Sequence, residues 1–396
     1  MGQRRRAWLV TFLVFPATVA ATLPPSAAAA TTAAAEAAPQ ARHVAPLVAA
    51  LDAEARSSRL AYRPDATVGA RTWRTDLAPL LARLPALNTV RTVTGPLHGR
   101  VVAGTLVLPA TVTIAGDTTI VVRRLVSTAP SVRVTTGGHD IHVYPIEGSS
   151  TIASLLIDTS GAKGADGADG ITPLPAADGD WGNDGWDGWS QTWCDGWPGG
   201  DGNDGQGGQR GDDGGWAWYG DNGGEITYDI PDGASGRYTF IADGGQGGTG
   251  GKGGMGGAGG VGGRGGRGGN AYVDDYCYGG TGGNGGSGGD GGTGGNGGPG
   301  GDGGVGGPIS VTYPRGFNRN AISARSGAGV LGPGGQPGEG GEGGSKGGGG
   351  PGGWGLGGRA ESGVPGWLDG FKGERGQLSG GDGREGSEGS IFVTER

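Results

Sequence analysis

Aromatic side chains are the residues whose type and spacing most suggest a binding chemistry. Seven of the eleven tryptophans lie between residues 181 and 218, and Trp186 and Trp189 are three residues apart. Exposed rings beside carboxylates can stack on a sugar ring while the carboxylates accept hydrogen bonds from its hydroxyls, although the rings could equally cap a structure that lacks other apolar cover. The residues predicted to contact a ligand are Trp186, Trp189, Trp193, Trp197, Tyr272, Tyr276 and Trp367.

Repeated carboxylates accompany these rings. They are Asp166, Asp169, Asp178, Asp180, Asp184, Asp187, Asp195, Asp201, Asp204, Asp212, Asp213 and Asp221. Such a series could ligate calcium through oxygen, or it could form a solvated acidic face balanced by Arg264 and Arg267. We favour the solvated face and predict no metal site, with calcium as the one cofactor that the sequence leaves open. The net charge of −8 argues against nucleic acid as a partner.

Catalytic motifs occur only in unsuitable contexts. Gly343 to Gly347 fit G-x-S-x-G, but no strand and helix flank them to form a nucleophile elbow. His139 and His142 are the one histidine pair, and two histidines without a third ligand indicate a solvated strand end more than a metal centre. We therefore predict that the protein is not an enzyme and has no catalytic residues.

The two cysteines and the N-terminal segment indicate export. Three arginines, an apolar run and a stretch of small residues predict a signal peptide over residues 1–30. Paired cysteines in an exported chain favour a disulfide, and Cys194 and Cys277 each occupy an interruption between glycine-rich runs. We predict a bond between them, a secreted, extracellular protein, and no membrane span.

Glycine sets the architecture that must position these residues. Of the 100 glycines nearly all lie in residues 161–390, on a three-residue frame, and residues 279–308 are ten consecutive Gly-Gly-X units. A left-handed extended helix has three residues per turn and no internal hydrogen bonds, so its backbone groups must pair with neighbours. Close packing requires glycine on each shared edge. The Gly-X-X runs before residue 224 should therefore lie outside, and the Gly-Gly-X runs over 244–308 between the others.

Short β-branched segments recur among these runs and predict the rest of the fold. The expected class is mainly β and irregular, with short strands forming a solenoid-like base and three hairpins of polyglycine-II helices packed as a bundle. The third hairpin is irregular, and its tip is expected at about residues 362–372. The predicted divisions are a signal peptide (1–30), an Ala-rich leader with short helices (31–100), a strand base (101–160), glycine-rich hairpins with interleaved strands (161–390) and a final strand (391–396).

The glycine runs resemble known repeat proteins. GGTGGNGGSGGDGG and GGKGGMGGAGGVGG are similar to the polyglycine-II bundles of springtail-type antifreeze proteins and phage tail-fibre adhesin tips, and to mycobacterial PE-PGRS glycine repeats. The resemblance covers about residues 161–390 and implies a fold more than a function. Collagen is the competing interpretation, but sparse proline and the Gly-Gly-X units are unfavourable for a triple helix.

Together these features predict a secreted structural or adhesin-like protein. It would be a rigid extracellular scaffold whose aromatic tips bind surface or cell-wall polysaccharide. The alternatives are a polysaccharide-degrading β-helix enzyme, for which Arg123, Arg124, Arg133 and Asp140 offer only scattered groups, and an ice-binding protein.

Overall fold

Strands of three to seventeen residues form a single parallel sheet in the computed structural model, which describes residues 44–58, 60, 73–148, 151–189, 193–272 and 276–396. The predicted signal peptide lies outside these ranges. The sheet contains eleven strands. They are β1 (Val90–Thr92), β2 (Leu97–Leu108), β3 (Thr111–Ser127), β4 (Ser131–Thr135), β5 (Ile141–Glu147), β6 (Ser154–Asp158), β7 (Ile226–Asp229), β8 (Arg237–Ile241), β9 (Ile309–Tyr313), β10 (Ile322–Arg325) and β13 (Ile391–Glu395), with η2 (Arg319–Ala321) before β10.

The order of pairing shows that the sheet is coiled. It runs β10-β8-β6-β4-β3-β5-β7-β9-β13, with β2 beside β3 and β1 beside β2. The first residues of β3 pair with β4 and its later residues with β5. The sheet therefore folds over itself along β3, and successive strands after it alternate between the two sides. Alternate inward side chains, such as Val132, Val134, Ile141 and Val143, fill the interior.

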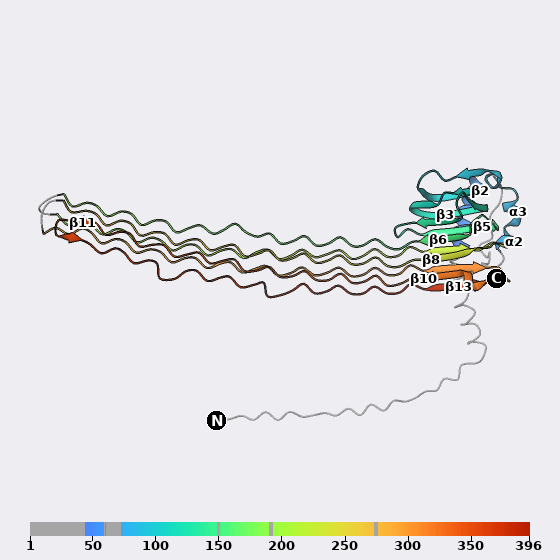
Figure 1. Cartoon of the computed structure of the whole chain (residues 1–396). Coiled ribbons are helices and arrows are strands. Elements are labelled where there is room, and N and C mark those ends of the chain that lie inside the picture. Colours follow the sequence, from blue (N-terminus) through green and yellow to red (C-terminus); the bar gives the residue numbers. More distant parts are fainter. Residues whose placement is uncertain (1–43, 59, 61–72, 149–150, 190–192, 273–275) are drawn as a thin grey trace, which may run out of the picture.

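Each of the last three turns of this coil contains one pair of long, extended, glycine-rich arms (Figure 1). We number them arm 1 (161–189), arm 2 (193–224), arm 3 (244–270), arm 4 (278–307), arm 5 (327–353) and arm 6 (360–389). Arms 1 and 2 lie between β6 and β7, arms 3 and 4 between β8 and β9, and arms 5 and 6 between β10 and β13. The short strands β11 (Trp354–Gly355) and β12 (Gly358–Arg359) join arm 5 to arm 6.

These findings correct the expected fold class. The protein is a nearly closed, solenoid-like parallel sheet with few helices, and a bundle of polyglycine-II helices is the wrong class; its mainly β character is confirmed. The glycine arms form no hydrogen-bonded helix and are insertions in turns of the sheet. The sequence interpretation failed because strands of four or five residues, separated by long arms, pair only with partners far along the chain.

Hydrogen bonds join the arms at each three-residue repeat, and in the Gly-Gly-X arms both glycines of a repeat donate. At one level of arm 3, the Gly259 N–H donates to Glu342 of arm 5 and the Gly260 N–H to Gln206 of arm 2, both at 2.8 Å. Arm 3 also accepts bonds from arms 1 and 4, for example from Gly179 to Val261. Arms 3 and 4, which carry the Gly-Gly-X units, thus have neighbours on both sides, whereas arms 1 and 2 lie at one end of the stack.

The repeated aspartates form a second ladder. In arms 1 and 2, carboxylate oxygens accept hydrogen bonds from backbone N–H groups of arms 3 and 4, and each donor lies 83 residues after its acceptor. Pairs with donor–acceptor distances of 2.6–2.8 Å are Asp166–Thr249, Asp169–Lys252, Asp178–Val261, Asp184–Arg267, Asp187–Asn270, Asp195–Tyr278, Asp201–Asn284, Asp204–Ser287 and Asp213–Asn296. These side chains are therefore structural acceptors, a role that the sequence analysis did not consider.

Helices cover the outer face of one side of the sheet. Residues 44–57 are helical, followed by α2 (Trp73–Asp76), α3 (Ala78–Leu81) and η1 (Pro85–Asn88). Their leucines form a second apolar cluster with Val121 and Tyr144 of the sheet. Beside this cluster, the fully buried carboxylate of Asp229 accepts hydrogen bonds from the Trp73 indole and from Thr312 (2.7 Å), and it pairs with Arg74 and Arg396. Burial raises the pKa of Asp229 to about 6.

Candidate functional site

Nine tryptophans and five other large aromatic residues are exposed along the arms and their far end. Those predicted to bind a ligand are all half or more exposed: Trp186 (80%), Trp189 (76%), Trp193 (67%), Trp197 (55%), Tyr272 (52%), Tyr276 (86%) and Trp367 (86%). Large apolar rings are rarely left uncovered in this number on one part of a protein. The far end of the arms is therefore the principal candidate for a binding surface.

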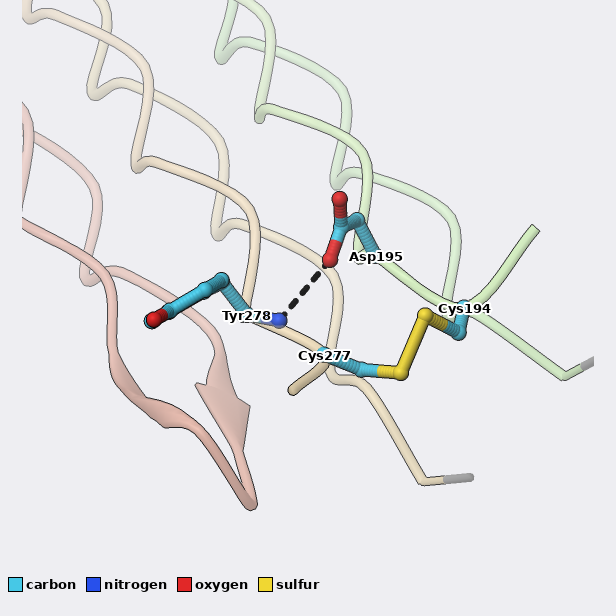
Figure 2. The surroundings of a disulfide bond; sticks show 4 residues. All are labelled: Cys194, Asp195, Cys277 and Tyr278. Atoms are coloured by element: carbon cyan, nitrogen blue, oxygen red, sulfur yellow. Dashed lines mark hydrogen bonds between the residues drawn. A yellow bond between two sulfur atoms is a disulfide. The ribbon is translucent and has the colours of Figure 1, made fainter. Parts of the chain in front are cut away.

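A disulfide at this end joins the first residues of arm 2 to the segment directly before arm 4 (Figure 2). Cys194 is bonded to Cys277, with 5.4 Å between their Cα atoms. Beside it, the Asp195 carboxylate accepts a hydrogen bond from the Tyr278 N–H at 2.8 Å. The two cysteines are 83 residues apart, the same offset as the aspartate ladder. The predicted disulfide is thus present and continues the register of the arms.

Two of the exposed rings are in contact. The centroids of Trp189 and Tyr272 are 5.7 Å apart, with their planes tilted by 44°. The Asn270 side chain donates a hydrogen bond to the Tyr272 hydroxyl at 2.9 Å, while the Asn270 N–H is held by Asp187. The Trp197 N–H donates to the Trp186 carbonyl at 2.9 Å, so these two tryptophans lie on facing segments of arms 1 and 2. Arms 1 to 3 therefore assemble an aromatic surface whose backbone is fixed by hydrogen bonds.

The structure corrects the expected position of the third tip. The turn lies between β11 and β12, and residues 362–372 belong to arm 6. Trp367 is accordingly some turns away from the end, because the Gly366 N–H pairs with Gly347 rather than with a residue near β11. Trp354, which is 53% exposed, lies next to the turn instead, as the first residue of β11. It directly follows the end of the regular glycine frame at Gly353, and that signal could have located it.

A second group of polar residues lies at the base, where arms 1 and 2 meet the sheet. The Asp140 N–H donates to the Asp117 carboxylate (3.1 Å), and the Asp140 carboxylate accepts from the Glu225 N–H (2.7 Å). His139 lies 3.7 Å from the Asp117 carboxylate. Burial lowers the pKa of His142, and the Asp140 and Glu225 charges oppose that shift. Sequence analysis noted the histidines but not their proximity to Asp117 and Glu225.

Two of the arginines considered for a β-helix enzyme are paired on the outside of the sheet. Arg124 pairs with Glu147 at 2.9 Å and Arg133 with Asp158 at 3.0 Å. Among the described residues, no three His, Cys, Asp or Glu side chains gather as metal ligands. No helix in the described ranges has the length and apolar character needed to cross a membrane.

Comparisons with known proteins give little similarity. No family model matches the chain, and no curated protein matches it. One solved structure, the nine polyproline type II helical bundle springtail antifreeze protein from Granisotoma rainieri, shares 28% identity over 47% of this chain and 94% of its own. The TM-score between the two structures is 0.07, which is too low to indicate a shared fold.

Proposed function

We propose that this protein is an extracellular, non-enzymatic binding protein that presents aromatic side chains to polysaccharide at the end of stiff arms. The observation that carries the proposal is the set of exposed rings at the far end, with Trp189 and Tyr272 in contact and Trp186 and Trp197 on facing arms. Indole and phenol rings offer flat apolar faces and polar edges, which suit a sugar ring better than a purely apolar ligand.

The backbone around these rings supports a binding role. Hydrogen bonds between arms and the disulfide fix the chain segments that carry Trp189, Trp193 and Trp197. A ligand would therefore meet a surface whose backbone is already ordered, so binding would lose less conformational freedom than a flexible loop does. Capping alone would explain rings that are covered, but not side chains with more than half of their surface exposed.

The test is a fluorescence titration of the intact protein with chitohexaose, cellohexaose and soluble cell-wall fragments. The double variant Trp193→Ala/Trp197→Ala removes two rings beside the disulfide. Its matched control is Trp216→Ala/Trp218→Ala, which removes two rings that are also more than half exposed but lie near the base. We expect saturable quenching that the first variant loses and the control keeps. Equal loss in both variants, or no quenching with any glycan, would refute the proposal.

The coiled parallel sheet favours a second candidate, a polysaccharide-degrading β-helix enzyme, since its fold is compatible with that type of protein. The group formed by Asp117, Asp140 and Glu225 would supply the carboxylates for acid and base catalysis. Release of reducing ends from a polysaccharide panel, abolished by Asp140→Asn and unaffected by Trp193→Ala/Trp197→Ala, would support this candidate over the first.

A further inference from the structure

Arm 6 contains two single-residue insertions. The N–H groups of Gly366 and Gly370 donate to Gly347 and Gly344 of arm 5, so four residues of arm 6 span three of arm 5. Gly376 and Gly380 repeat this pattern with Gly338 and Gly335. Where arm 6 keeps its three-residue spacing, the residue directly after each glycine accepts a hydrogen bond from arm 4, as Glu374 does from Gly294. At the insertions Leu368 and Leu378 accept instead, so Trp367 and Gln377 are the extra residues.

The second insertion coincides with a pocket of about 280 Å³. Arm 2 contributes Arg210, arm 4 contributes Thr293 and Asn296, and arm 6 contributes its residues 374–378. Gly376 and Gly380, on either side of the extra residue, still pack closely against Gly295 and Gly298 of arm 4, so the arms stay in contact through their glycines there. The inserted residue, Gln377, is thus itself part of the pocket lining.

The lining is polar and its charges nearly cancel. Arg210 pairs with Asp213, and Arg375 lies 3.4 Å from the Glu339 carboxylate, so both guanidinium charges have acidic partners. Glu374 adds one further negative charge, which disfavours a polyanionic ligand. Asn296 accepts a hydrogen bond from the Leu378 N–H at 3.1 Å through its side-chain oxygen, while its amide nitrogen is a donor. Leu378 itself is 65% exposed and adds an apolar surface.

We infer that this pocket is a second carbohydrate site, which binds one neutral sugar unit of a glycan. The inference rests on the proposed function. Donors from Arg375, Gln377 and Asn296 and an acceptor at Glu374 match the mixed donors and acceptors of sugar hydroxyls, and Leu378 provides contact for the carbon face. Small-molecule sites commonly combine a cavity of a few hundred Å³ with a small number of such polar groups.

Deletion of Gln377 tests the site because it restores the three-residue spacing. Gln377→Ala is the matched control, since it keeps the inserted residue. In isothermal titration with chitohexaose and cellohexaose, we expect two sites per chain in the wild-type protein and in Gln377→Ala, and one in the deletion variant. Glu374→Gln/Arg375→Leu, which leaves the backbone frame unchanged, should also show one site. Two sites in both the deletion and the double variant would overturn the inference.

The outcomes separate this site from the aromatic end. Trp193→Ala/Trp197→Ala should retain the arm site and lose the other. Binding that the tip variant abolishes, and that the deletion of Gln377 leaves unchanged, would refute the arm site alone. Binding that disappears only on deletion of Gln377 would support the arm site and refute the proposed role of the tips. An absence of binding to the wild-type protein would refute both.

Discussion

Two glycine-to-alanine substitutions should have opposite effects on stability. A Cβ at Gly289 of arm 4 would lie closer than 3 Å to backbone atoms of Gln206 in arm 2. At Gly348 of arm 5, nothing lies within 4 Å of the added Cβ, and neither glycine has a positive φ. Gly348→Ala should raise the free energy of unfolding by about 0.4–1 kcal/mol, because alanine restricts the unfolded chain more than glycine does.

The cost of Gly289→Ala follows from the bonds that join arms 2 and 4 at this level. Moving arm 4 away would break Gly205 N–H to Ser287 (2.9 Å), Gly208 N–H to Asp290 (2.7 Å) and Ser287 N–H to the Asp204 carboxylate (2.6 Å). At about 1 kcal/mol for each net hydrogen bond, the loss is about 3 kcal/mol. Urea titrations of both variants and the wild-type protein measure the difference. If Gly289→Ala is as stable as Gly348→Ala, direct contact between arm backbones is not what requires glycine.

Three further perturbations test other parts of the structure. Cys194→Ser/Cys277→Ser should lower the free energy of unfolding by about 4.5 kcal/mol, because the disulfide closes a loop of 83 residues and so restricts the unfolded chain. Urea titrations measure this loss. A loss below about 1 kcal/mol would show that the arms are in register without the bond. Asp204→Ala should cost about 1 kcal/mol and Asp204→Asn almost nothing, because asparagine keeps an acceptor oxygen for the Ser287 N–H; equal costs would exclude the ladder as the cause. Since burial raises the pKa of Asp229 to about 6, the native state binds the proton more tightly than the unfolded state, so its contribution to stability is full below about pH 4 and is lost as pH rises through 6. Urea titrations at pH 4 and pH 7 should show this loss, at most about 3 kcal/mol, in the wild-type protein relative to Asp229→Asn, and parallel profiles would contradict it.

Local patterns in the sequence predicted the parts of this structure that depend on neighbouring residues. The alternation of β-branched residues indicated the strands, and the aromatic interruptions placed Cys194 and Cys277 at adjoining turns. The coil of the sheet depends instead on pairing over long separations, such as β6 with β8 and β7 with β9, each 83 residues apart. No local pattern encodes that offset, and the short strands were therefore read as a minor base.

The candidate site, like the fold, could be predicted from the sequence only in part. Exposure of the tryptophans was predictable because a glycine-rich chain offers no apolar interior to bury them. The position of Trp367 was not, because the frame slip at this residue can mark either a turn or an insertion within an arm. The hydrogen bonds distinguish the two. Gly366 donates to Gly347 and Gly370 to Gly344, so the slip is an insertion within arm 6. The buried pairing of Asp229 with Arg74 and Arg396 likewise joins residues that the sequence separates widely.

Strands in the sheet and residues in the arms pair at the same sequence offset. β6 pairs with β8 at an offset of 83 residues, the aspartates of arms 1 and 2 accept bonds at that offset, and Cys194 and Cys277 are bonded at that offset. Packing of the apolar core of the sheet fixes this offset where the arms leave the strands. The hydrogen bonds between arms then keep the same offset along their whole length. Aromatic rings at the far end are thus positioned by strands at the base, which explains why a chain with so little to bury in its arms retains a packed sheet.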